Sequence, residues 1–250
     1  MVQHGKDVAK IGRIDVHSHL LPGVDDGCQT PEESIACARE LVAAGYTHSF
    51  CTPHIWPSFP KNTVDEIPKR VAQLQQIYDA ASIPLRLFSG GELNLRLNLA
   101  QTPGDQIVSY AMARKQVLID FWAERLPDHF QPTMRWLQSL GMTVVLAHPE
   151  RVRAVQEQPD LADQFADMGL LLQGNLQCFG DPPTSAARQV AEQYLLEGRY
   201  FMLGSDTHGP DTVPVRLRGL ARAIELAGDD VIMRLTRDNP LQLLPENLAL

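Results

Sequence analysis

The sequence lacks the features that mark membrane proteins and nucleic-acid-binding proteins. No apolar run approaches the ~20 residues of a bilayer-spanning helix, and residues 1–13 lack the apolar core of a signal peptide. Lys and Arg number 22 against 30 Asp and Glu, which gives a formal net charge of −8 and no basic run. This balance disfavours a nucleic-acid or membrane-surface partner. We therefore expect a cytoplasmic protein without membrane insertion.

Cysteine is also scarce, and its spacing excludes one group of mechanisms. The four cysteines, Cys28, Cys37, Cys51 and Cys178, form no Cys-x-x-Cys pair, which predicts free thiols in a reducing cytosol. We expect Cys37 and Cys51 to be buried in core elements. None of the four begins the Cys-x5-Arg phosphate loop of the cysteine-dependent phosphatases.

What the sequence does contain is a regular alternation of apolar runs and helical segments. Continuous apolar runs are typical of parallel strands covered on both faces. With no linker and no internal repeat, the pattern predicts a tail at 1–12 and one α/β domain at 13–250, arranged as a barrel of about seven strands. The strands are predicted at 13–17, 47–52, 84–88, 116–121, 143–147, 170–174 and 200–204.

Helix signals separate these strands. Thr30 followed by Pro31 and Glu33 predicts an N-cap with a capping box, and Gly45 predicts the end of that helix. The stretch 94–114 has mixed periodicity and gives no clear prediction. Further helices are predicted from 62–63 to 77 and at 132–140, 151–156, 160–168, 184–197, 213–227 and 229–236.

Residues that can bind metals stand at the ends of six of the seven predicted strands. His17 and His19 alternate with Ser18 and therefore point to the same side of their strand. Taken singly, each such residue also fits a helix cap, a core histidine or a solvated turn. Together they indicate one site, because the carboxyl ends of parallel strands form the active face of α/β folds. The set is His17, His19, Asp26, His54, Glu92, Asp120, His148, Asp206 and His208.

A set of this size exceeds the four to six ligands of one ion and predicts two or three metals. Imidazole and carboxylate ligands without thiolate favour Mn, Fe or Zn over Ca or Mg. Such a centre suits phosphate ester hydrolysis by a hydroxide that bridges the metals. Arg151 would then bind phosphate oxygens, although it also fits a surface helix start. The aromatic residues Trp56, Phe59 and Trp122 fit either a pocket for an aromatic leaving group or ordinary core positions.

The ordered motifs resemble a known group of enzymes. Ile-Asp-x-His-Ser-His, Val-Asp-Asp-Gly, Thr-Pro-His, Gly-x-Glu, Leu-Ala-His-Pro-Glu-Arg and Ser-Asp-x-His resemble the polymerase-and-histidinol-phosphatase (PHP) superfamily. More closely, they resemble its bacterial manganese-dependent protein tyrosine phosphatases of the CpsB/YwqE type. The resemblance spans roughly residues 13–210.

The resemblance implies a distorted (β/α)7 barrel, three metals, and the nine residues above as their ligands. It matches Asp26 to the ligand and leaves Asp25 as a turn or supporting residue. Asp120 stands where the family usually has glutamate, so its carboxylate sits back by about 1.5 Å, one C–C bond length. Trp122 lies in a segment that replaces the usual proline-bearing loop. A second phosphate-binding arginine of the family corresponds to Arg216 only across a loop that aligns insecurely.

These observations lead to one main hypothesis and two alternatives. The main hypothesis is a phosphotyrosine protein phosphatase, acting on the tyrosine-rich tail of a kinase that controls capsule or exopolysaccharide synthesis; the kinase and pathway come from the resemblance alone. The alternatives are a phosphatase for a small metabolite such as histidinol phosphate and a non-catalytic metal-binding PHP module. An oligomer is compatible with the sequence.

Overall fold

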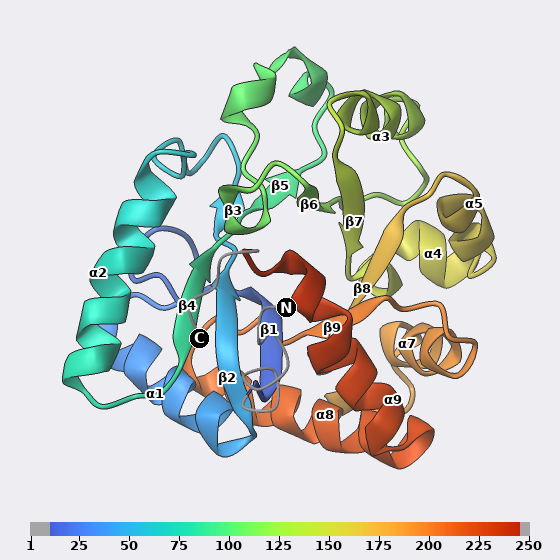
Figure 1. Ribbon diagram of the computed structural model, residues 1–250. Coiled ribbons are helices and arrows are strands. Elements are labelled where there is room, and N and C mark those ends of the chain that lie inside the picture. Colours follow the sequence, from blue (N-terminus) through green and yellow to red (C-terminus); the bar gives the residue numbers. More distant parts are fainter. Residues whose placement is uncertain (1–10, 246–250) are drawn as a thin grey trace, which may run out of the picture.

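Parallel strands form a ring in the computed structural model, which describes residues 11–245 (Figure 1). Two hydrogen-bonded groups, ordered β1-β2-β4 and β3-β5-β6-β7-β8-β9, make up this ring. The strands are β1 (Arg13–Ser18), β2 (Tyr46–Cys51), β3 (His54–Ile55), β4 (Arg86–Ser89), β5 (Glu92–Asn94), β6 (Gln116–Asp120), β7 (Thr143–Ala147), β8 (Leu171–Asn175) and β9 (Met202–Gly204).

Two of the seven predicted strands are each interrupted once. β2 continues into β3 after Thr52-Pro53, and β4 continues into β5 after Gly90-Gly91. β2 pairs with β4 and β3 pairs with β5, so the two interruptions lie side by side. A Cβ atom on Gly91 would approach Val108 Cγ1 to 2.6 Å, which explains the glycine there. The nine strands therefore occupy seven positions, as the sequence predicts.

The ring closes between β9 and β1. Asp206 N donates to His17 O at 2.6 Å, and His19 N donates to Thr207 O at 2.9 Å. Ser18 and Thr207 form an isolated parallel bridge at the same place. The predicted distorted (β/α)7 barrel is confirmed, and its closure brings the first and last predicted ligand segments together.

Helices surround the ring on its outer side (Figure 1). Most predicted helices are confirmed with shifted ends. α2 starts later than predicted, with Pro68 in its first turn, and α9 ends early in a π-type turn at Arg234–Asp238. The helices are α1 (Pro31–Ala43), α2 (Glu66–Ala80), α3 (Phe130–Ser139), α4 (Arg153–Glu157), α5 (Leu161–Asp167), α6 (Leu176–Gly180), α7 (Ala186–Leu196), α8 (Val213–Ala227) and α9 (Asp229–Met233).

The capping box predicted at the start of α1 is only half right. Thr30 Oγ1 accepts from Glu33 N at 3.3 Å, as an N-cap should. The Glu33 carboxylate, however, accepts from Gln29 N at 2.7 Å instead of from Thr30 N. The ambiguous stretch 94–114 contains short 3-10 turns at Leu99–Gln101, Gly104–Gln106 and Tyr110–Met112.

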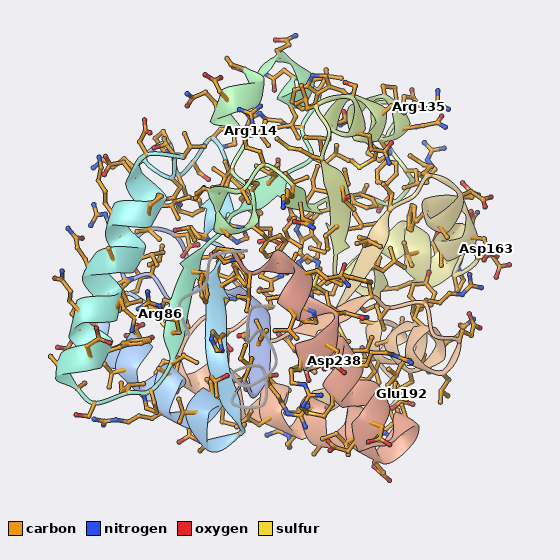
Figure 2. The ribbon with its side chains drawn as sticks, in the orientation of Figure 1. Arg86, Arg114, Arg135, Asp163, Glu192 and Asp238 are labelled. Atoms are coloured by element: carbon orange, nitrogen blue, oxygen red, sulfur yellow. The ribbon has the colours of Figure 1, made fainter. Side chains whose placement is uncertain are left out.

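Successive side chains along the strands point alternately into the barrel and toward the helices, and they form two separate hydrophobic clusters. Leu118 and Val145 pack inside the ring with Ile14 and Met202, whereas Val117 and others face the helices. Apolar side chains thus fill the barrel interior, which leaves the carboxyl ends of the strands as the place for polar groups. Charged side chains such as Arg135, Asp163 and Glu192 lie at the outer rim (Figure 2).

No helix of residues 11–245 is both long and apolar enough to cross a bilayer. The predicted tail at 1–12 and the end of the predicted domain at 246–250 lie largely outside the described residues.

Candidate metal centre

The two histidines at the end of β1 meet at the carboxyl end of the barrel. His17 and His19 are almost fully buried, and their Nε2 atoms lie 3.2 Å apart. Both Nε2 atoms lie 3.3 Å from Asp206 Oδ1, which follows β9. The ring closure described above therefore creates the centre of this cluster.

Glu92, at the start of β5, is the carboxylate that joins most of the histidines. Its Oε2 atom lies 3.5 Å from His17 Nε2 and 2.8 Å from His54 Nδ1. Its Oε1 atom lies 2.9 Å from His148 Nε2. The side chain is 1% exposed, so these groups meet in a site shielded from solvent.

Asp26 and His208 close the solvent-facing side of the cluster. Asp26 Oδ1 lies 3.2 Å from His54 Nε2 and 3.6 Å from His208 Nε2, and its side chain is 61% exposed. The residues form two sets, and within each set the potential ligand atoms all lie within 4.8 Å of one another. The first set is His19, Asp26, His54 and His208, and the second is His17, His19 and Glu92. His19 belongs to both sets.

Neighbouring polar groups orient the histidine rings. Gln173 Nε2 donates to Gly174 O at 2.6 Å, which leaves its Oε1 to accept from His17 Nδ1 at 2.9 Å. Asp25 Oδ2 accepts from His19 Nδ1 at 2.8 Å. Each ring therefore carries a proton on its outer nitrogen, and in the neutral imidazole the lone pair of Nε2 points inward, as in metal-binding imidazoles.

The same contacts confirm the supporting role predicted for Asp25. Its Oδ1 accepts from Gly27 N at 2.9 Å, and its Oδ2 also accepts from His54 N at 3.0 Å. Burial by itself would raise the pKa of Asp25, but the hydrogen bond and charge of His19 lower it to about 2. Asp25 thus stays ionised and joins the loop to two predicted ligands.

The electrostatics of the cluster favour added positive charge. Burial by itself would lower the pKa of His17 and His19, but Glu92 and Asp206 raise it for His17, and Asp206 and Asp25 raise it for His19. Burial would raise the pKa of Glu92 and Asp206, yet the histidines hold both values well below the usual range. Carboxylates that stay ionised while buried need cations beside them.

Several buried atoms of the cluster have no hydrogen-bond partner within the described residues. They are His54 Nδ1, Glu92 Oε2, Asp120 Oδ1 and His148 Nδ1. His54 Nδ1 and Glu92 Oε2 lie close together, but their orientation does not form a hydrogen bond. Buried polar atoms are rarely left without partners. These orphaned atoms and the converging Nε2 lone pairs fit divalent cations.

Two predicted ligands also hold an uncommon backbone conformation. His148 has φ of 31° and Asp206 has φ of 53°, in the left-handed region that L-residues seldom adopt. His148 N donates to Gln173 O at 2.7 Å, which holds the turn in place. Such strain is typical of functional sites, where the surrounding structure fixes a side-chain direction.

Asp120 lies at the edge of the cluster. Its Oδ2 accepts from Trp122 Nε1 at 3.1 Å, and no histidine among residues 11–245 lies within ion-pair distance. Burial and the charge of Glu92 raise the pKa of Asp120 well above its usual value. The structure thus places Asp120 beside the site without joining it to the other ligands, and its metal contact stays a prediction.

The two predicted phosphate-binding arginines differ in their surroundings. Arg151 is partly exposed, donates to Asp206 Oδ2 at 2.7 Å, and lies 4.8 Å above the Trp122 ring. Arg216 is buried, and its Nε and NH2 groups donate to Asp206 O at 3.1 and 2.6 Å. Its NH1 group donates to Thr212 O. Arg216 therefore holds the loop of Asp206, and its predicted contact with substrate stays a prediction.

Two site residues at the end of β8 are missing from the sequence-based set. Gln173 binds His17 as described, and Asn175 Nδ2 donates to Asp206 Oδ2 at 2.7 Å. β8 is the strand for which no metal ligand is predicted. The signal was present, because Gln173 and Asn175 are polar residues two apart at the end of an apolar strand, as are His17 and His19.

The aromatic residues considered for a pocket lie around the cluster. The Trp56 ring lies 4.0 Å from that of His54, and the Phe59 ring is stacked at 6.1 Å from His54. Trp122 is 54% exposed, and its ring lies 6.1 Å from that of His148. They form part of the rim of the site, instead of the barrel core.

A ring of parallel strands with histidines and carboxylates at its carboxyl end defines a PHP-type barrel with a candidate metal centre. A family model described as "Capsular polysaccharide synthesis, CpsB/CapC" matches residues 13–245. This chain belongs to the CpsB/CapC family, which confirms the resemblance stated from the motifs.

Individual relatives agree with this assignment. The tyrosine-protein phosphatase YwqE of Bacillus subtilis is 29% identical over 203 residues, which are 80% of this chain and 78% of that protein. The tyrosine-protein phosphatase CpsB of Streptococcus pneumoniae is 24% identical over 246 residues, 94% of this chain and 99% of that protein.

A solved structure from a study of these two proteins, described as "unique metal-dependent tyrosine phosphatases", has a TM-score of 0.82. It is 25% identical, and the match covers 92% of this chain and 94% of that one. A histidinol phosphate phosphatase from Lactococcus lactis shares the fold with a TM-score of 0.52 and 14% identity, over 86% of this chain and 94% of that one.

Proposed function

We propose that this protein is a metal-dependent phosphomonoesterase that hydrolyses phosphotyrosine in proteins. The main observation behind this proposal is the cluster of buried histidines and carboxylates. Its converging Nε2 atoms and its buried atoms without hydrogen-bond partners fit divalent cations. The relatives named as tyrosine-protein phosphatases, and the solved structure described as metal-dependent, support this substrate and this requirement.

The metals would be held by the nine residues that the strand ends predict. In our proposal these are His17, His19, Asp26, His54, Glu92, Asp120, His148, Asp206 and His208. We propose three metals, most simply Mn, with Fe or Zn as alternatives, because the ligands are imidazoles and carboxylates. When bound, such ions polarise phosphate oxygens and lower the pKa of water to near neutrality.

The chain itself supplies binding and orientation. Arg151 lies beside Asp206 at the partly exposed edge of the cluster, where its planar guanidinium can bind the non-bridging oxygens of a phosphate. Trp122 beneath it keeps the guanidinium in place. A phenol has a pKa near 10, so a tyrosine leaves more readily than a serine and depends less on a general acid.

The cysteines are unsuited to act as nucleophiles. All four are buried and unpaired by disulfides. The pKa of Cys28 is raised, first by its contact with Cys37, and burial raises the pKa of Cys51 and Cys178. The thiolate is the reactive form, so Cys28, Cys51 and Cys178 stay protonated and unreactive near neutral pH.

The test compares metal removal with cysteine removal. We expect a chelator to abolish hydrolysis of a phosphotyrosyl peptide and Mn²⁺ to restore it, whereas replacing all four cysteines by Ser leaves kcat within a fewfold of the parent. Histidinol phosphate and a phosphoserine peptide serve as competing substrates. Preferred turnover of histidinol phosphate would favour the metabolite phosphatase, and metal-loaded protein without aryl phosphatase activity would favour a non-catalytic module.

The proposed function also includes a cellular role. We propose one cytoplasmic catalytic domain over residues 13–250 that acts on the phosphorylated tail of a bacterial tyrosine kinase. The family description, which names capsular polysaccharide synthesis, supports a role in capsule or exopolysaccharide production.

A further inference from the structure

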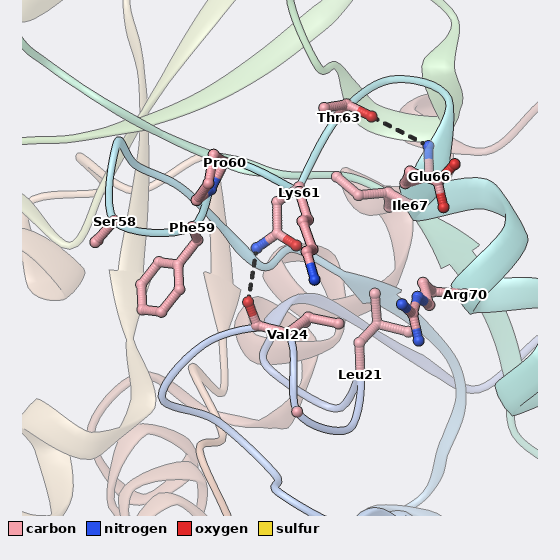
Figure 3. A pocket seen from close by; sticks show the side chains of 12 residues that line it. Leu21, Val24, Ser58, Phe59, Pro60, Lys61, Thr63, Glu66, Ile67 and Arg70 are labelled. Atoms are coloured by element: carbon pink, nitrogen blue, oxygen red, sulfur yellow. Dashed lines mark hydrogen bonds between the residues drawn. The ribbon is translucent and has the colours of Figure 1, made fainter.

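A cleft of about 430 Å³ opens beside the metal cluster, between the loop after β1 and the start of α2 (Figure 3). Leu21, Val24, Phe59 and Ile67 give it an apolar lining. Its volume lies in the range of ligand-binding clefts. None of the nine predicted metal ligands lines it, so the cleft is an addition to that site.

The cleft is joined to the cluster through two of its lining residues. Asn62 Nδ2 donates to Val24 O at 3.1 Å and to His54 O at 2.9 Å. Phe59 stacks against the His54 ring at 6.1 Å. Val24 also lies two residues before Asp26. One end of the cleft therefore adjoins the solvent-facing side of the cluster.

The charge of the cleft distinguishes it from an ordinary apolar hollow. Lys61 and Arg70 are exposed and line it, and neither side chain makes a hydrogen bond or ion pair within residues 11–245. Glu66, the acidic residue of the lining, is paired with Lys69 Nζ at 2.6 Å. The cleft thus presents two cations that have no hydrogen-bond or ion-pair partner within residues 11–245, in a protein whose net charge is −8, although the charge of Arg70 also acts on Glu66.

We propose that this cleft binds the polypeptide that flanks the phosphotyrosine and selects an apolar side chain together with an acidic one. The proposal rests on the proposed function, because the phosphotyrosine occupies the adjoining cluster. The apolar lining takes the hydrophobic side chain, and Lys61 and Arg70 pair with the carboxylate. A phosphotyrosyl peptide thereby gains contacts that a free aryl phosphate cannot make.

The experiment reverses the charge of the cleft. We compare the K61E/R70E variant with wild type on phosphotyrosyl peptides that carry Glu-Leu or Lys-Leu beside the phosphotyrosine, and on p-nitrophenyl phosphate. We expect KM for the Glu-Leu peptide to rise about tenfold, as the loss of two partly exposed ion pairs allows. The Lys-Leu peptide becomes the better substrate, while kcat and p-nitrophenyl phosphate hydrolysis stay within twofold.

The control is Arg135→Glu, a single charge reversal of the same kind on α3, away from α2 and the cleft (Figures 1 and 2), and it is compared with K61E/R70E and with each of K61E and R70E alone. It should leave the peptide preference unchanged. Fluorescence anisotropy with non-hydrolysable phosphonate analogues of both peptides measures binding without turnover. The K61E/R70E variant should bind the Glu-Leu analogue about tenfold more weakly.

The outcomes separate this inference from the proposed function. If p-nitrophenyl phosphate and peptides are hydrolysed but flanking charge changes neither KM nor analogue binding, the cleft inference is wrong and the function stands. If no aryl phosphate is hydrolysed, the proposed function is wrong, and the anisotropy still reports on the cleft. A changed sedimentation coefficient of K61E/R70E with unchanged peptide binding would assign the cleft to a second copy of the chain and overturn the inference.

Discussion

The orientation of the Gln173 side-chain amide determines which ring nitrogen of His17 carries a proton. Because Gln173 Nε2 is held by Gly174 O, its oxygen faces His17 Nδ1 and fixes the proton there. The Nε2 lone pair is then available at the centre of the cluster, 3.2 Å from that of His19. The lone pairs of two neutral rings would repel each other unless a proton or a metal ion lies between them, so Gln173 prepares the site for a cation.

At this scale we predict that Gln173→Met weakens metal binding. The ring of His17 loses its acceptor and its fixed tautomer, and the loss of such a partner typically lowers metal affinity about 10–100-fold. Gln173→Glu keeps an oxygen toward Nδ1 and should restore most of the affinity. Chelator competition measures the dissociation constant directly, apart from turnover.

The control is Gln177→Met on α6, which makes the same replacement away from the histidines. Equal losses of affinity in both variants, or no rescue by Glu, would mean that Gln173 only supports packing.

At the scale of elements, the backbones of α6 and α8 lie in close contact. A Cβ atom on Gly219 of α8 would lie 1.7 Å from Leu176 O, and one on Gly180 of α6 would lie 2.2 Å from Val215 O. The two glycines let the helix backbones touch. The same contact positions Arg216, which holds the carbonyls of Ser205 and Asp206. The loop after β9, which carries Asp206 into the cluster, thus depends on helix packing behind it.

We predict that Gly219→Ala destabilises the protein, although Gly→Ala in an open helix interior is stabilising by about 1 kcal/mol. The added methyl group cannot be placed without separating α6 from α8, and overpacking of this kind typically costs about 1–3 kcal/mol. Chemical denaturation of the metal-loaded protein measures the free energy of unfolding.

The comparison variant is Arg218→Ala, an exposed neighbour on the same helix. It should change the stability by no more than about 0.5 kcal/mol. A Gly219→Ala protein as stable as the parent would show that the helices separate at little cost.

At the scale of the whole molecule, the centre draws on the first and the last strand of the barrel. β1 brings His17 and His19, and the segment after β9 brings Asp206 and His208, so the cluster exists only when the ring is closed. Ions bound there interact with the folded state alone. Metal binding and global stability should therefore be linked.

We predict that metal loading raises the thermal midpoint. One ion at 100 times its dissociation constant adds about 2.7 kcal/mol, which corresponds to roughly 5–10 °C in a protein of this size. Differential scanning calorimetry with chelator, Mn²⁺, Zn²⁺ and Mg²⁺ measures the shift, and Mg²⁺ should have the smallest effect because imidazole suits it poorly. A midpoint that is the same with chelator and with Mn²⁺ would contradict a structural metal centre.

Much of the site could be predicted because its signals are local. Strand ends are visible where an apolar run stops, and alternation along β1 places His17 and His19 on one side without any tertiary information. The chirality and direction of parallel strands then bring all the ends to one face. The barrel, the gathering of histidines and carboxylates at its carboxyl end and the free thiols follow from the amino-acid sequence in this way.

Tertiary structure decided how these residues divide their roles. Glu92 contacts four histidines, Arg216 binds backbone carbonyls, and Gln173 orients His17. All three roles depend on side-chain directions across the closed ring. The cleft likewise depends on packing between α2 and the loop after β1. A sequence specifies which groups reach a strand end, but distances between groups far apart in the chain exist only after the barrel closes.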